Sequence, residues 1–410
     1  MPLTQTTLGE RLRDARQNCG LTQEDAALAI NIPRTALLHI ETGKRALTSL
    51  EAVRLARLYR RDLNSLLSDE EPAAESPLVA LCRIAPAVAD HPLVRMEISR
   101  YLGLFQEACV LERLLGKRSR SAPPAYDLPE PERREDAAEQ GETVADEERR
   151  RLNLGARPIA DVAEVLAREG VWAAAAALPD DFSGLFLSHP SLGLAILVNE
   201  SHTRGRRRFS YGHEYAHALL DRLRHPATVT QRQNGTELME RRANAFAAAF
   251  LMPAAGVTDL LDTLNKGAGS RETFWVWDVA NESGEHFERR NAPGSQTIGY
   301  QDVAYLAHEF MVSYDAAAYR LSDLGRITRP QLEELLLQRP LGQQLIGLLH
   351  LRNPDAREQD DQPRLTAEIG RLAVEAYRQE AISGGRLLDV CDKLGIAEGE
   401  QLLELVRSGR

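Results

Sequence analysis

The pentapeptide at residues 213–217 constrains the fold of this 410-residue chain more than any other feature. It reads His213-Glu214-Tyr215-Ala216-His217, and two helical residues four apart lie on one face, one turn apart. Both imidazoles can therefore reach one metal ion at about 2.0–2.1 Å. Glu214 is rotated by about 100° from His213, so its carboxylate can reach a water on the metal rather than the metal itself. The spacing predicts a helix that carries two zinc ligands and a general base.

A catalytic zinc needs a third protein ligand and an open fourth position. The best candidate for that ligand is Glu240, which begins a helix with small and aromatic residues on one stripe. The alanines of that stripe would let the two helices approach closely. Glu237 is the alternative ligand. The competing interpretation of His213 and His217 is a pair of core histidines, because the five-residue motif also arises by chance.

Composition indicates a cytoplasmic chain with no membrane span. No run of 18 apolar residues occurs, and the N-terminus has neither a basic region nor a hydrophobic stretch. The four cysteines are widely spaced, which is typical of a reducing compartment. The hydrophobic content of 43% is sufficient for two or three domains with real cores.

Charge is unevenly distributed along the chain. The net charge is −10, which argues against a protein that coats nucleic acid. Residues 1–67, however, hold ten Lys/Arg and seven Asp/Glu. A mildly basic N-terminal segment on an acidic chain is compatible with DNA contact through that segment alone.

The predicted fold class is mainly α with a small β-sheet, an α+β architecture. Four short helices are expected in residues 6–67, and residues from 300 onward are expected to be mostly helical. A buried strand is expected at Val171–Leu178. A hairpin is expected where Leu185–Leu187 and Leu194–Val198 flank a Ser-His-Pro-Ser turn.

The metal motif and its surroundings resemble the ImmA/IrrE metallopeptidase family. The resemblance covers about residues 145–325 and rests on five stretches: Ala195–Asn199, Tyr211–Leu220, Glu240–Pro253, Phe310–Ser313 and Tyr319–Leu321. It implies zinc as cofactor, His213, His217 and Glu240 as its ligands, and Glu214 as the base. It also implies site-specific cleavage of a helix-turn-helix repressor, usually coupled to DNA damage. Arg242 and Phe250 replace a commoner acid and leucine.

The N-terminal segment is similar to the Cro/repressor-type (XRE) helix-turn-helix. Leu21–Glu24 and Ile32–Arg45 carry the similarity, and Pro33 stands where a capping residue is common. The second helix of such a unit enters the major groove. Base or phosphate contacts are expected from Gln23, Arg34 and Thr35. Phosphate contacts alone are expected from Lys44 and Arg45. The alternative is a module for docking the partner repressor or for dimerisation.

Cys109 is a candidate inhibitory ligand at the open zinc position, because thiolate binds zinc strongly. A thiol at that position would exclude the catalytic water until a signal releases it. Cys82 is the second choice. The alternative is that Cys109 is a small buried hydrophobic residue, which is more usual for a free cysteine.

Five segments follow from these motifs. They are a helix-turn-helix domain (1–70), a helical connecting segment (71–116), a flexible linker (117–145), a zinc metallopeptidase domain (146–330) and a helical C-terminal regulatory region (331–410). A separate linker-like stretch is expected at residues 68–75. Residues 301–324 have a second helix-turn-helix pattern.

The function expected from the sequence is a regulated endopeptidase that cleaves a partner repressor when stress is sensed. The domain order resembles relatives of the CapP type, which accompany phage-defence operons. The C-terminal helices or residues 301–324 could sense an activator such as single-stranded DNA. Two arginine clusters are candidate phosphate contacts, with solvated arginines as the alternative: Arg206–Arg208 and Arg289–Arg290. The substrate is expected to lie as an extended strand along the hairpin edge. The alternative function is a DNA-binding regulator whose zinc domain is sensory or structural.

Overall fold

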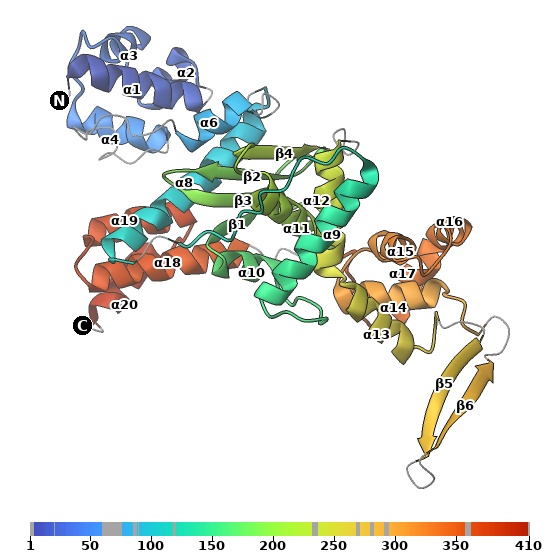
Figure 1. Ribbon diagram of the computed structural model, residues 1–410. Helices are drawn as coiled ribbons and strands as arrows, with labels where there is room; N and C mark the ends of the chain where they lie inside the picture. The colour runs from blue at the N-terminus through green and yellow to red at the C-terminus, as the bar shows by residue number, and fades with distance from the viewer. Residues whose placement is uncertain are drawn as a thin grey trace. The chain divides into compact units, whose positions relative to one another are not determined.

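The computed structural model, drawn as a ribbon in Figure 1, divides into two compact units. Unit 1 comprises Met1–Ser119, His189–Leu192 and Thr366–Arg410, and unit 2 comprises Arg120–Ser188 and Gly193–Leu365. The structure describes residues 4–19, 21–59, 76–84, 88, 90–117, 120–231, 237–267, 271–278, 283–290, 295–356 and 362–408. The linker predicted at residues 68–75 lies outside these ranges.

Unit 1 is built mainly from helices. They are α1 (Gln5–Asn18), α2 (Gln23–Ala29), α3 (Arg34–Glu41), α4 (Ser49–Leu58), α6 (Pro77–Ile84), α8 (Pro92–Leu114), α18 (Gln362–Arg378), α19 (Gly384–Leu394) and α20 (Gly399–Ser408). The first four confirm the predicted helix-turn-helix domain. Helices α6 and α8 fall in the stretch expected to be a helical connecting segment.

Local sequence signals fix the ends of the helix-turn-helix elements. Thr22 caps α2 in a reciprocal capping box with Asp25, and Pro33 precedes α3 without a side-chain cap. Gly43 follows α3 with a φ of 71°, and a Cβ there would lie 2.8 Å from the Cα of Thr6. Glycine is therefore required by both conformation and space.

The C-terminal helices of unit 1 are anchored to α8 by a buried carboxylate. Glu107 of α8 accepts hydrogen bonds from Arg386 at 2.7 Å and from Lys393 at 2.6 Å, both on α19. The Glu107 side chain is only 4% exposed. Two cations thus compensate its buried charge, and α19 packs on α8 instead of forming a free tail.

Unit 2 combines a four-stranded sheet with helices and a separate two-stranded ribbon. The strands are β1 (Val171–Ala176), β2 (Phe182–His189), β3 (Gly193–Asn199), β4 (Ala227–Gln231), β5 (Arg271–Asp278) and β6 (Ser283–Arg290). The helices are α9 (Arg134–Arg151), α10 (Val162–Arg168), α11 (Arg204–Leu220), α12 (Leu238–Leu251), α13 (Ala254–Thr263), α14 (Tyr300–Phe310), α15 (Tyr314–Asp323), α16 (Arg329–Leu337) and α17 (Arg339–Leu348). The mainly helical α+β class is confirmed.

The sheet order is β1-β3-β2-β4, which confirms the predicted strand and hairpin. Strand β1 pairs in parallel with β3, and β4 pairs antiparallel with β2. Both hairpin strands therefore have neighbours on each side. The prediction that a substrate uses the hairpin edge is wrong, because the outer strands of this sheet are β1 and β4.

The prediction of a flexible linker at residues 117–145 is wrong for residues 134–145. These residues belong to α9, which packs along α12 (Figure 1). The buried face of α9 uses small and medium residues: Ala137, Gly141, Val144 and Ala145. A Cβ on Gly141 would lie 2.4 Å from the Arg242 carbonyl oxygen, so only glycine allows this approach. A search for large apolar side chains misses such a face.

The compact unit that contains the metallopeptidase-like residues extends beyond the boundary predicted at residue 330. Unit 2 continues to Leu365, and Leu332, Leu335 and Ile346 of α16 and α17 join its hydrophobic core. The C-terminal helices of unit 1 begin only with α18. The predicted pair of helices at 301–324 is present as α14 and α15, with Met311 in the left-handed region between them.

Within the described residues, no single helix has the length and composition to cross a bilayer. Helices α12 and α13 meet that test only as a bent pair.

Candidate functional site

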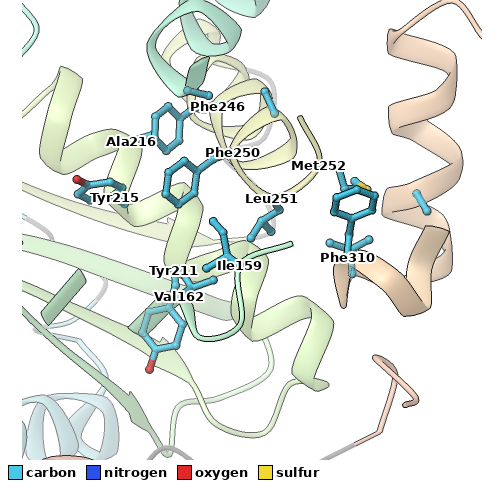
Figure 2. Close-up of a cluster of buried hydrophobic side chains, with 14 of the residues drawn as sticks. Ile159, Val162, Tyr211, Tyr215, Ala216, Phe246, Phe250, Leu251, Met252 and Phe310 are labelled. Atoms are coloured by element: carbon cyan, nitrogen blue, oxygen red, sulfur yellow. The ribbon is translucent and has the colours of Figure 1, made fainter. Parts of the chain in front are cut away.

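Helices α11 and α12 pack closely because small residues meet at their interface. A Cβ on Gly212 of α11 would come within 3.4 Å of the Ala247 Cβ of α12, an ordinary contact distance. One side of the pair carries the aromatic core: Tyr215, Phe246 and Phe250 contact one another, with ring centroids 5.3–6.0 Å apart (Figure 2). The core fixes how the two helices are rotated against each other, and with that the positions of their polar residues.

His213, His217 and Glu240 converge as predicted. The two Nε2 atoms lie 3.2 Å apart. Glu240 Oε2 lies 3.1 Å from Nε2 of His213, and Glu240 Oε1 lies 3.5 Å from Nε2 of His217. Within the described part of the chain, these three are the one cluster of His, Cys, Asp or Glu side chains close enough together to hold a metal ion.

The geometry of this group fits a tetrahedral divalent ion. Two nitrogen ligands at about 2.0–2.1 Å from zinc in tetrahedral geometry lie about 3.3 Å apart, close to the distance between the two Nε2 atoms. Two imidazoles and one carboxylate are a donor set that zinc uses in catalytic sites, with the fourth position open.

Each histidine of this group has its Nδ1 atom within hydrogen-bond distance of a side-chain oxygen. Nδ1 of His213 lies 2.9 Å from Oδ1 of Asn244, and Nδ1 of His217 lies 2.7 Å from Oδ2 of Asp221. These bonds place the proton on Nδ1 and leave Nε2 for the metal. Sequence reasoning missed both partners, although Asp221 follows His217, and Asn244 follows Glu240, by one helical turn.

Glu214 lies beside this group and is completely buried. Thr228 of β4 donates a hydrogen bond of 3.5 Å to Oε2 of Glu214, whereas Oε1 has no hydrogen-bond partner among the described residues. Oε1 lies against Gly184 of β2, where a Cβ would come within 2.8 Å. The carboxylate is therefore held between strand and helix, with one oxygen not committed to a hydrogen bond among the described residues.

Burial and hydrogen bonding shift the pKa values of these groups in different directions. Burial raises the pKa of Glu214, although His213 and His217 oppose the rise. Burial would lower the pKa of His217, but the bonds to Asp221 and Glu240 outweigh it and raise that pKa to about 10. For Glu240, burial is outweighed by the two histidines, which lower its pKa to about 2.

The charge count of the site also favours a divalent cation. Three buried carboxylates, on Glu214, Glu240 and Asp221, face one buried guanidinium, on Arg242. With neutral histidines this leaves two net negative charges in a low-dielectric interior, which one divalent ion balances. Without an ion, a proton on His217 relieves part of the excess.

The alternative ligand Glu237 does not enter the group. It is the exposed N-cap residue of α12, three residues before Glu240. Glu240 points toward the two histidines because packing of the aromatic core sets the rotation of α12 about its axis.

Cys109 lies on α8 in unit 1, whereas the metal residues lie in unit 2. Its Sγ lies 3.7 Å from the carbonyl oxygen of Leu192, also in unit 1, and the side chain is half-buried. Burial raises the pKa of the second choice, Cys82, which opposes thiolate formation. The inhibitory role of Cys109 stays a prediction.

Two of the predicted DNA contacts are engaged inside the helix-turn-helix domain. Gln23 donates a 2.9 Å hydrogen bond to Glu41, and Arg45 donates a 2.8 Å bond to Glu51. The three others are exposed: Arg34, Thr35 and Lys44.

The candidate phosphate contacts have mixed outcomes. Arg208 is buried and donates to the carbonyl oxygens of Ile159, Ala160 and Met311, which is a structural role. Arg207 is buried as well, and Arg206 lies 3.4 Å from the Ser183 hydroxyl. The side chains of residues 289 and 290 lie outside the described part of the chain.

Comparison with known families agrees with this geometry. Residues 12–66 match a helix-turn-helix family, and residues 169–276 match the IrrE N-terminal-like domain, a peptidase family. The chain therefore joins a helix-turn-helix domain to a domain of the metallopeptidase class. More particularly, the part of the chain that is similar to the IrrE N-terminal-like domain contains His213, Glu214, His217 and Glu240. No curated protein shows a significant match.

Proposed function

We propose that this chain is a zinc-dependent, site-specific endopeptidase that cleaves a partner helix-turn-helix repressor. Cleavage would answer a stress signal such as DNA damage and derepress a stress or phage-defence operon, as in relatives of the CapP type. The observation that carries the proposal is the buried Glu214 carboxylate beside the histidine and glutamate ligands. A metal site with a purely structural role needs no base at that position.

The chemistry assigned to Glu214 follows from its surroundings. When bound, zinc would polarise the scissile carbonyl and acidify the attacking water. Glu214 would accept the proton of that water on Oε1, the oxygen without a hydrogen bond among the described residues. Because burial raises the pKa of Glu214, the carboxyl group can hold the proton and then release it to the leaving amine.

Strand β4 is the best candidate for binding the substrate. It is an outer strand of the sheet, and its Thr228 contacts Glu214. An extended segment of the repressor that pairs with β4 would bring its peptide bonds to the site by β-augmentation. The main-chain bonds would supply affinity, and side-chain contacts would supply the choice of cut site.

The helix-turn-helix domain is proposed to bind operator DNA through α3. Arg34 and Thr35 at the start of α3, with Lys44 after it, are exposed and suited to base or phosphate contact. Single-stranded DNA is a candidate activator, and Cys109 a candidate inhibitory ligand. Docking of the repressor by this domain is the alternative to DNA binding.

The decisive experiment mixes the purified protein with the repressor encoded beside it, under inducing conditions. Wild-type protein is expected to cut the repressor at one site, while Glu214→Gln leaves it intact but keeps its zinc. Glu139→Gln, an exposed carboxylate on α9, is the matched control and should cleave normally. A wild-type protein that leaves the repressor intact under every inducing condition would contradict the proposal.

The second candidate function is a DNA-binding regulator whose zinc domain is sensory or structural, which the helix-turn-helix domain favours. In that case Glu214→Gln would regulate the promoter as wild type does. A gel shift on the promoter at low salt tests the DNA-binding part, and its absence would favour protein docking.

A further inference from the structure

A fully buried arginine contacts Asp221, the hydrogen-bond partner of His217. Arg242 of α12 is 0% exposed and lies two residues after Glu240. Its Nη2 donates to Oδ1 of Asp221, and its Nη1 donates to Oε1 of Gln140 on α9 at 3.0 Å. The guanidinium thus joins the three helices that pack together around the site.

Asp221 connects this arginine to a metal ligand. It is the C-cap residue of α11 and only 3% exposed. One carboxylate oxygen accepts the Nδ1–H of His217 at 2.7 Å, and the other accepts from Arg242. The sequence of contacts therefore runs from Gln140 through Arg242 and Asp221 to His217.

We propose that Arg242 is a positioning residue of the metal centre, acting through Asp221 on His217. The proposal rests on the metal site of the proposed function and adds a residue to it. Because both oxygens of Asp221 are hydrogen-bonded, the plane of its carboxylate is fixed. That plane sets the orientation of the His217 imidazole, whose Nε2 would bind the ion.

The physical need for Arg242 comes from burial. A carboxylate that is 3% exposed carries a large desolvation penalty unless a buried cation compensates it. Removing Arg242 leaves the Asp221 carboxylate with His217 as its remaining hydrogen-bond partner among the described residues, so the carboxylate gains freedom to reorient. His213 needs no such device, because its Nδ1 contacts the neutral amide of Asn244.

Lysine cannot fully replace this arginine. The guanidinium uses two separate nitrogens, one for Asp221 and one for Gln140, in a rigid planar fork. An ammonium group keeps the charge but has a shorter reach and no fixed plane. The charge and the fork can therefore be separated by experiment.

The test is zinc affinity, measured by competition with a chromogenic chelator on the full-length protein. Arg242→Gln is expected to bind zinc about 10–100-fold more weakly, and Arg242→Lys to fall between it and wild type. The absorption spectrum of the cobalt-substituted protein should change in Arg242→Gln, because it reports ligand geometry.

The matched control is Arg149→Lys. Arg149 is 3% exposed on α9 and donates to backbone carbonyl oxygens, among them that of Phe250 on α12. This variant should lower the melting temperature without changing zinc affinity or the cobalt spectrum. An equal loss of zinc affinity in Arg149→Lys would show general destabilisation and overturn the proposal.

Asp221→Asn is the second variant, and it decides the matter if Arg242→Gln does not fold. It keeps an oxygen for His217 but removes the charge that Arg242 compensates, so a similar loss of affinity is expected. If both Asp221→Asn and Arg242→Lys bind zinc with wild-type affinity, the positioning role of Arg242 is overturned, while the proposed function stands. A wild-type protein that binds no zinc overturns the proposed function as well.

Discussion

Two buried arginine–carboxylate pairs in this protein have different surroundings. In the helix-turn-helix domain, Arg16 donates to both oxygens of Glu41, and the remaining contacts of the pair end on Gln23 and the Leu21 carbonyl. In the IrrE-like domain, Arg242 and Asp221 lead to His217. The same chemical pair therefore joins helices in one domain and, in the other, also contacts His217, the proposed metal ligand.

The largest expected effect separates fold from site. Glu41→Ala leaves Arg16 buried without its charged partner, so the helix-turn-helix domain should lose about 3–5 kcal/mol of unfolding free energy. Denaturant unfolding of the full chain, followed by circular dichroism, measures this loss in the transition of that domain. Zinc affinity is expected to stay at the wild-type value. A variant as stable as wild type would show that the pair contributes nothing to the fold.

The next effect concerns geometry at the site. Gly184→Ala adds a Cβ that would lie 2.8 Å from Glu214 Oε1 and 3.1 Å from the Leu197 carbonyl oxygen. The base must shift, and repressor cleavage should fall about 100-fold. Zinc affinity should change little, because the ligands are untouched. Gly193→Ala is the less suitable control, since its φ is 80°, whereas Gly103→Ala meets no atom within 4 Å and should cleave normally.

The third effect is a pH dependence confined to the metal-free protein. The pKa of His217 is raised to about 10 in the fold, against about 6.5 in the unfolded chain. Its protonated form therefore stabilises the metal-free fold fully below pH 6.5, and this contribution is lost as pH rises toward 10. The melting temperature of the chelator-treated protein should fall by several degrees across that window.

The zinc-loaded protein should lack this dependence, because the ion replaces the proton. A His217→Gln variant provides the comparison, since it cannot bind the proton at all. Equal slopes of melting temperature against pH in wild type and His217→Gln would refute the assignment to His217.

The smallest effect tests a local signal. Thr22→Ala removes the capping box of α2 and should cost about 1 kcal/mol of stability. Thr22→Ser keeps the hydroxyl and should be nearly neutral. The measurement is again denaturant unfolding, and a loss as large as that of Glu41→Ala would place this cap on a level with the buried ion pair.

Several features could be predicted because they depend on spacing along one helix. The roles expected of His213, Glu214 and His217 follow from helical periodicity alone. The similarities of the N-terminal segment and of residues 145–325 to known families could be predicted because their motifs are short and contiguous in the chain. Helix α9 was missed, because a face of Ala137 and Gly141 has no large apolar residue to reveal it.

The sequence by itself determined which residues can bind a metal and which carboxylate lies one position from the first ligand, since a helix has a fixed period. Only the tertiary structure decided that Glu240 and not Glu237 completes the group, because the rotation of α12 is set by its aromatic core. It also decided that Arg242 of α12 pairs with Asp221 at the end of α11. That contact joins two helices, and it depends on packing rather than on position in the chain.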